Sequence, residues 1–182
     1  VIICLLTLAF RLYFAFSVES FSSDESYFHF RLVNYIIENK LPMFHDSLSY
    51  CSGNIYYPQL FHILLVLFSF IPYFLKIFPA IIASSLVIVV YLIAKKITND
   101  DVSSLLTAFL AAFIPIEIRN SVNQISIYSF IIPLILILYL CLINIEQKKY
   151  FNLFLVLSFL LPLIHTSSLL FIFSLLFYFI LS

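Results

Sequence analysis

Residues 79–94, PAIIASSLVIVVYLIA, contain no charged side chain and end at the pair Lys95-Lys96. Similar apolar runs make up most of the 182 residues, of which 64% are hydrophobic and only 10% are charged. A soluble core of this size could not enclose so many apolar side chains, whereas a bilayer needs about 20 apolar residues for each helical span. The composition therefore predicts an integral membrane protein.

The apolar runs predict an all-α fold, a polytopic bundle of about six transmembrane helices. None of them alternates as a barrel strand in lipid must, and a helix satisfies every backbone group within its own segment. The chain starts without Met and ends inside an apolar run, so we expect an N-terminal fragment, truncated at both ends, of a longer protein. The other runs are residues 1–18, 58–75, 102–116, 125–145, 150–164 and 168–182.

Two lysine pairs give the expected orientation. Lys95-Lys96 and Lys148-Lys149 each close an apolar run, and short basic loops stay in the cytoplasm. Two spans separate the pairs, so the turns at 117–124 and 165–167 are expected on the external side.

The acidic loop that begins at residue 19 also suits the external side. We therefore expect an external loop over residues 19–76 with two membrane-surface helices, the second of them within run 58–75. The alternative is that this run forms a true span, which would place Asp24 in the cytoplasm.

The densest polar stretch is residues 22–31, SSDESYFHFR. Ser22 and Glu25 have the spacing of a capping box, and Pro42 follows, so the pattern predicts a helix over residues 24–39. In such a helix Glu25 and His29 lie one turn apart on one face. Apolar side chains fill the neighbouring arc, which is typical of a helix at a membrane surface.

Asp24 and Glu25 are the candidate catalytic residues. Adjacent carboxylates at a membrane surface can take a proton from an incoming nucleophile or hold a divalent cation, for which Glu25 is the candidate metal ligand. The alternative is that both are helix-start acids favoured by the helix dipole.

Five further residues are candidates for substrate binding: His29, Arg31, Tyr57, Arg119 and His165. The guanidinium of Arg31 matches phosphate oxygens, although Arg31 could instead pair with Asp24 or Glu38. Tyr57 belongs to an aromatic cluster that forms either a sugar-stacking surface or an interfacial belt.

The remaining two candidates lie at predicted helix ends. Arg119 faces an anchored phosphate or forms a solvated pair with Glu117. His165 lines the same cavity as the others or only caps a helix.

These motifs resemble the first external loop of the type C glycosyltransferases, which are polyprenyl-phosphate-dependent membrane enzymes. The likeness is closest to the catalytic subunit of oligosaccharyltransferase, and it rests on residues 25–31 (ESYFHFR), 38–39, 44–46 (FHD) and 56–58 (YYP). Residues 103–122 resemble the span and turn ahead of that family's second acidic motif. The Asp24-Glu25 pair is also similar to the loop acid of dolichyl-phosphate-mannose-dependent mannosyltransferases and lipid A aminoarabinose transferases.

The resemblance implies transfer of a sugar or oligosaccharide from a polyprenyl phosphate or diphosphate donor to a protein, lipid or glycan acceptor. The reaction would take place on the external or lumenal face of the cell membrane or the endoplasmic reticulum. In the family, loop acids bind a divalent cation, Mg²⁺ or Mn²⁺, and Glu25 falls at the position of the loop acid. Residues 123–129, NQISIYS, have no acid where the second motif has two. The alternatives are a metal-independent branch with Asp24 or Glu25 as base, and a protein that has lost activity.

Other classes of function fit the sequence less well. Nine basic and nine acidic residues balance, so we expect no nucleic acid partner. The rival class is a non-catalytic membrane protein, such as a transporter fragment or a scaffold that binds a lipid-linked glycan. Transporters place polar residues at Gly or Pro breaks in mid-membrane, whereas this chain has one Gly and keeps its charges in loops, which favours an interfacial site.

Overall fold

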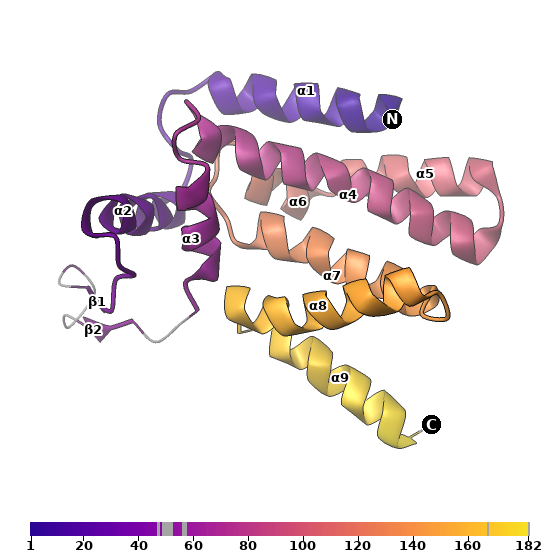
Figure 1. The fold of residues 1–182 in the computed structure, drawn as a ribbon. Helices are drawn as coiled ribbons and strands as arrows, with labels where there is room; N and C mark the ends of the chain where they lie inside the picture. Colours follow the sequence, from indigo (N-terminus) through magenta and orange to yellow (C-terminus); the bar gives the residue numbers. More distant parts are fainter. Residues whose placement is uncertain (47, 49–52, 56–57, 167, 182) are drawn as a thin grey trace.

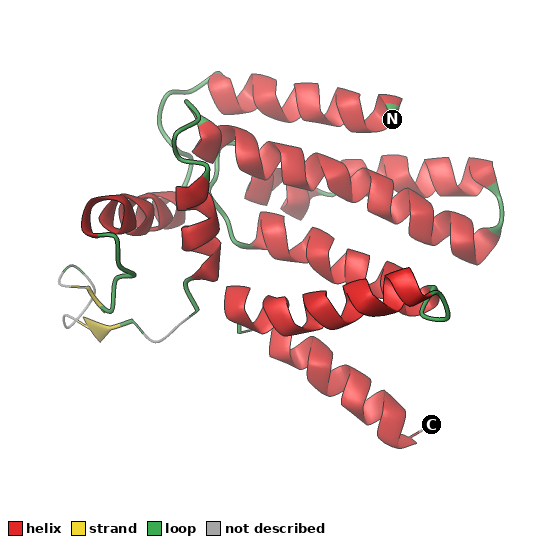
Figure 2. Ribbon diagram, viewed as in Figure 1, coloured by secondary structure: helices red, strands yellow, loops and turns green. Residues whose placement is uncertain are grey.

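The computed structural model of the protein describes the chain except residues 47, 49–52, 56–57, 167 and 182 (Figure 1). The described part is mostly helical and has one short antiparallel pair of strands (Figure 2). The elements are α1 (Ile2–Phe16), α2 (Asp24–Asn39), β1 (His45–Asp46), β2 (Gly53–Asn54), α3 (Leu60–Leu67), α4 (Phe74–Thr98), α5 (Asp101–Ala112), α6 (Pro115–Ser121), α7 (Tyr128–Ile143), α8 (Lys148–Ile164) and α9 (Ser168–Leu181). The expected helical class is confirmed, and the small hairpin is an addition to it.

The centre of the fold is α4, which contains the apolar run 79–94 and packs against α1, α5 and α7. It is 25 residues long and ends at Thr98. The next residue, Asn99, caps it: its backbone is left-handed (φ 53°), and its N–H donates to the Lys95 carbonyl. Each of the other apolar runs also contains the greater part of one helix, because backbone groups among apolar side chains find partners only within a helix.

The two ends of the molecule contain different elements. Figure 1 shows α2, α3 and the hairpin together at one end, and the α4–α5 and α7–α8 turns at the other. Lys95 and Lys96 lie in the last turn of α4, and Lys148 begins α8, so both lysine pairs lie at the end away from α2.

Length and composition identify one helix among the described residues that could cross a membrane, α4. A second candidate exists if α5 and α6, which meet at a bend of 53°, form one span. The helices α1 and α7 are apolar but have only 15 and 16 residues. The polytopic bundle of about six spans stays a prediction.

The helix predicted over residues 24–39 is confirmed as α2, but the predicted capping box is wrong. Ser23 is the N-cap, and its Oγ accepts from the backbone N–H of Ser26. Ser22 instead donates through its Oγ to the carbonyl of Asn123 (3.1 Å), so its hydroxyl is engaged across the fold. At the other end, Lys40 takes a left-handed conformation before Pro42.

The short helix α3 packs against α2. Phe61 and Leu65 of α3 are buried in one cluster with Val33 of α2. With eight residues α3 is too short to span a bilayer. Two helices thus occupy the stretch where two membrane-surface helices were expected, and their contact with lipid stays a prediction.

The bend between α5 and α6 is held by a buried arginine of α1. Arg11 donates to the carbonyl of Ala112 (3.0 Å), to the carbonyl of Glu117 (3.2 Å) and to Ser121 Oγ. The contact with Ala112 gives a partner to one of the last carbonyls of α5, which have none within their own helix. The Glu117 side chain is itself 4% exposed, so the solvated pair of Glu117 with Arg119 that the sequence allowed is wrong.

Candidate functional site

The first turn of α2 is held by the non-helical segment 122–127, which joins α6 to α7. Ser22 N–H donates to the Asn123 carbonyl (3.1 Å), and Asn123 Nδ2 donates to the Ser20 carbonyl (2.6 Å). Ile125 N–H donates to Ser26 Oγ (3.0 Å). The segment that lacks the expected second acidic motif therefore acts as a support, because its backbone and amide fix the position of the turn that carries Glu25.

Glu25 lines two cavities at this end of the fold. The first, of about 260 Å³, is lined by His29, His62 and His165. The second, of about 400 Å³, is lined by Arg119 and by two side-chain amides, Asn120 and Gln124. Tyr128 of α7 also lines both cavities, so Glu25 and Tyr128 mark the place where they meet. We call them the histidine cavity and the arginine cavity.

Two buried imidazoles form the wall of the histidine cavity. His29 Nδ1 lies 2.8 Å from His62 Nε2, and His29 Nε2 lies 3.5 Å from Glu25 Oε1. Burial lowers the pKa of His29, which the Glu25 carboxylate offsets in part. Burial and the neighbouring His29 lower the pKa of His62 to about 3. Both rings are therefore neutral at pH 7, and one of them must donate the hydrogen bond that they share.

The arginine cavity presents hydrogen-bond donors around Glu25. Arg119 is exposed at the end of α6, whereas Gln124 is only 9% exposed. A guanidinium and two amides provide the donors that a phosphate group accepts best. The arrangement can hold an anion beside the Glu25 carboxylate.

The structure brings four of the candidate residues together and separates two others from them. Glu25, His29, His165 and Arg119 line the two adjoining cavities. Asp24 is exposed on the first turn of α2 and lines neither of them. Tyr57 lies outside the described residues.

Arg31 is engaged elsewhere, and the expected pairing with Asp24 or Glu38 is wrong. Its guanidinium forms an ion pair with Asp46, whose carboxylate is 4% exposed. The hairpin places Asp46 beside α2, which no spacing within the helix could have indicated. Arg31 is thus part of the support of the hairpin rather than of either cavity.

Four residues of the site were not candidates: His62, Asn120, Gln124 and Tyr128. His62 carried a usable signal, because it is an isolated imidazole in an apolar run and follows Gln59 by three residues. Gln124 and Tyr128 lie in the stretch 123–129, where the resemblance predicts acids. Their place in the site follows from the docking of segment 122–127 against α2, which is a tertiary contact.

The donor set does not fit the expected Mg²⁺ or Mn²⁺. Within the described residues, no three His, Cys, Asp or Glu side chains come together as a metal site. Glu25 provides the one carboxylate among the described lining residues of both cavities, whereas these cations need several oxygen ligands. We therefore assign Glu25 no metal.

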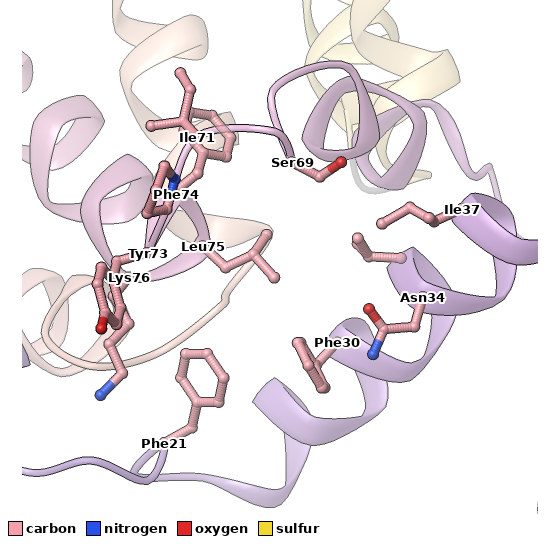
Figure 3. Close-up of a pocket in the computed structure, with 12 residues that line it drawn as sticks. Phe21, Phe30, Asn34, Ile37, Ser69, Ile71, Tyr73, Phe74, Leu75 and Lys76 are labelled. Carbon is pink, nitrogen blue, oxygen red and sulfur yellow. The ribbon is translucent and has the colours of Figure 1, made fainter.

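A third cavity, of about 300 Å³, lies on another face of α2 (Figure 3). Its walls are apolar, with Phe30 and Ile37 from α2 and Leu75 from α4. Lys76 reaches its edge, but its Nζ donates to the carbonyls of Val18 and Glu19 (2.7 Å each). The cavity has no acid among its described lining residues, so the acid and base groups gather on the other side of the helix.

Comparison with known proteins finds no matching family model, no similar curated protein and no similar solved structure. Fold and site together define a mostly helical protein with an acid, histidine and arginine site at one end of its helices.

Proposed function

We propose that the protein is a membrane glycosyltransferase module that transfers a sugar or oligosaccharide from a polyprenyl phosphate or diphosphate donor to an acceptor on the external face. One observation carries this proposal: Glu25 lies where a cavity lined by Arg119 and two side-chain amides meets the histidine cavity. A base and an anion site side by side are what transfer from a phosphorylated donor requires.

The reaction is an inverting displacement at the anomeric carbon. Glu25 takes the proton from the acceptor hydroxyl or amide as that atom forms its bond to the anomeric carbon. The bond from this carbon to the phosphate oxygen breaks, and its electron pair leaves with the phosphate. Arg119 neutralises the charge that develops on the leaving group, and Gln124 donates to its oxygens. No step needs a metal.

The membrane assignment completes the proposal. Large apolar side chains are exposed along the outer faces of several helices, such as Leu6 on α1, Leu110 on α5 and Phe159 on α8. Exposed apolar surface on this scale suits contact with lipid chains. In a bundle of about six spans, the donor's tail would stay in lipid while its head group enters the arginine cavity at the surface.

Neighbouring acids provide a matched test. We expect Glu25→Gln to slow transfer by about 100-fold or more, since a general base contributes about 10²–10⁴. Asp24→Asn, which removes a charge outside both cavities, should stay within about threefold of the unmodified protein, because surface charges contribute little. The chain in nanodiscs would receive farnesyl-phosphoryl mannose, glucose or N-acetylglucosamine with water as the minimal acceptor, and released farnesyl phosphate would be measured.

Two results would contradict the assignment of Glu25. Equal loss of transfer activity in both variants would show that the two acids do not differ in role. Full activity in Glu25→Gln would exclude Glu25 as the base. Binding of farnesyl phosphate without release from any of the three donors would instead indicate a scaffold for lipid-linked glycans.

A further inference from the structure

The histidine cavity contains a hydrogen-bonded pair that the transfer reaction does not use. His29 comes from α2 and His62 from α3, and His62 is 1% exposed. The pair is held in register because α3 packs its apolar face, with Phe61 and Leu65, against Val33 of α2. The 2.8 Å contact between the two rings is therefore part of the interface between these helices.

The arrangement of protons in the pair follows from Glu25. Two neutral imidazoles share one hydrogen bond, so one nitrogen donates and the other accepts. If His29 donated through Nδ1, its Nε2 lone pair would face the Glu25 carboxylate at 3.5 Å. Two acceptors would then oppose each other. If His62 donates through Nε2, His29 carries its proton on Nε2 and directs it at the carboxylate.

We propose that His62 is a positioning residue for Glu25: by donating to His29 Nδ1 it holds His29 in the tautomer whose Nε2–H orients the Glu25 carboxylate. This inference rests on the proposed function for its catalytic consequence. At 3.5 Å the contact is longer than a hydrogen bond, and catalytic contacts of this kind generally tighten when substrate binds. His62 acts through His29 and touches no reacting atom.

The surroundings keep the pair neutral, as this arrangement requires. The titratable groups that face it are Glu25 from α2, Tyr128 from α7 and His165 from the end of α8. Burial lowers the pKa of both rings of the pair, so both are neutral at pH 7.

Two substitutions of His62 distinguish its hydrogen-bond donation to His29 from the packing of its side chain. His62→Gln places an amide donor where the imidazole Nε2 lies, and His62→Leu keeps a similar volume without a donor. In the full chain, with histidine labelled with ¹⁵N, we expect the unsubstituted protein and His62→Gln to show His29 protonated at Nε2. In His62→Leu, where Glu25 alone still favours this tautomer, the fraction of His29 protonated at Nε2 should fall. Adding Glu25→Gln should shift the His29 Nε2 resonance in the unsubstituted protein and in His62→Gln, and by less than half as much in His62→Leu.

Enzyme turnover by the same His62 variants provides a second test. We expect His62→Leu to lower kcat for farnesyl phosphate release about tenfold with KM unchanged, below the full contribution of a general base, and His62→Gln to restore it. A proton on His29 Nδ1 in the unsubstituted protein, or an unchanged tautomer or kcat in His62→Leu, would overturn the proposal. Absence of release from any donor would count against the proposed function, whereas the resonances would still decide the role of His62.

Discussion

At the scale of single residues, Asp24 and Glu25 are adjacent in the chain yet have different surroundings. Both belong to the first turn of α2, where the helix dipole favours acids. Only Glu25 points to the side where segment 122–127, α3 and α7 meet, and it lines both cavities. The turn of about 100° between consecutive helical residues explains the difference. The sequence predicted the pair, but it could not choose between its members.

Arg119 and Arg31 allow the phosphate site to be tested. We expect Arg119→Gln to weaken binding of radiolabelled farnesyl phosphate about tenfold, because a hydrogen bond to a charged group contributes about 1.5–3 kcal/mol. Arg31→Gln is the matched control, since Arg31 pairs with Asp46 outside both cavities. Equilibrium dialysis with the chain in nanodiscs would measure the affinities, with farnesol as the ligand that lacks phosphate. Equal losses in the two variants would show that Arg119 has no specific role.

The lowered pKa of His62 predicts how the free energy of unfolding depends on pH. Its pKa is about 3 in the folded protein and 6.5 in its ordinary state, so between these values the unfolded chain binds a proton that the folded chain excludes. The free energy of unfolding should therefore fall as the pH decreases from 6.5 towards 3, by at most about 1.4 kcal/mol per pH unit from this group. His62→Gln should remove this part of the slope in chemical unfolding between pH 7 and pH 4. His45→Gln, at an exposed position of the hairpin, should keep it, and equal slopes in both would refute the assignment.

At the scale of elements, local patterns predicted the helices and missed what holds them together. The bounds of α2 follow from its cap residues and from Pro42, and the apolar runs locate the longer helices. The bend between α5 and α6 follows from Pro115, but Arg11 at that bend belongs to α1, about 100 residues earlier. Such contacts between distant segments leave no periodic signal in a single sequence.

A substitution of Asn123 tests whether segment 122–127 holds the first turn of α2 in place. Its backbone is left-handed (φ 54°), which Asn tolerates, and its side chain donates to the Ser20 carbonyl. Asn123→Ala should lower the free energy of unfolding by about 2–3 kcal/mol, the sum of a lost hydrogen bond and the strain of alanine in this region. Hydrogen exchange should rise in the first turn of α2.

The matched control for Asn123 is Asn99→Ala. Asn99 has a similar backbone (φ 53°) but ends α4 at the far end of the molecule, so this variant should lose stability without raising exchange in α2. If exchange in the first turn of α2 rose equally in both variants, segment 122–127 would have no local role.

At the scale of the whole molecule, the end of the fold that carries the site is opposite the end that carries the lysine pairs. The order of the apolar runs predicts the same separation, provided that residues 58–75 form a membrane-surface segment. The structure gives a physical reason for that treatment, because the run is divided between the short helix α3 and the start of α4, with a break at residues 68–73. If α4 spans a membrane, the chain crosses once between α2 and the α4–α5 turn.

Accessibility of single cysteines tests that crossing. In a background with the three native cysteines replaced by alanine, Ser20→Cys and Asn99→Cys are both exposed, one beside α2 and one at the end of α4. If the site faces outwards, a membrane-impermeant maleimide should label Ser20→Cys on intact cells and Asn99→Cys only after the membrane is opened. The alternative, in which residues 58–75 form a true span, places both cysteines in the cytoplasm and protects both. That result would also overturn the external reaction, since the cavities at Glu25 would then open towards the side of the lysine pairs.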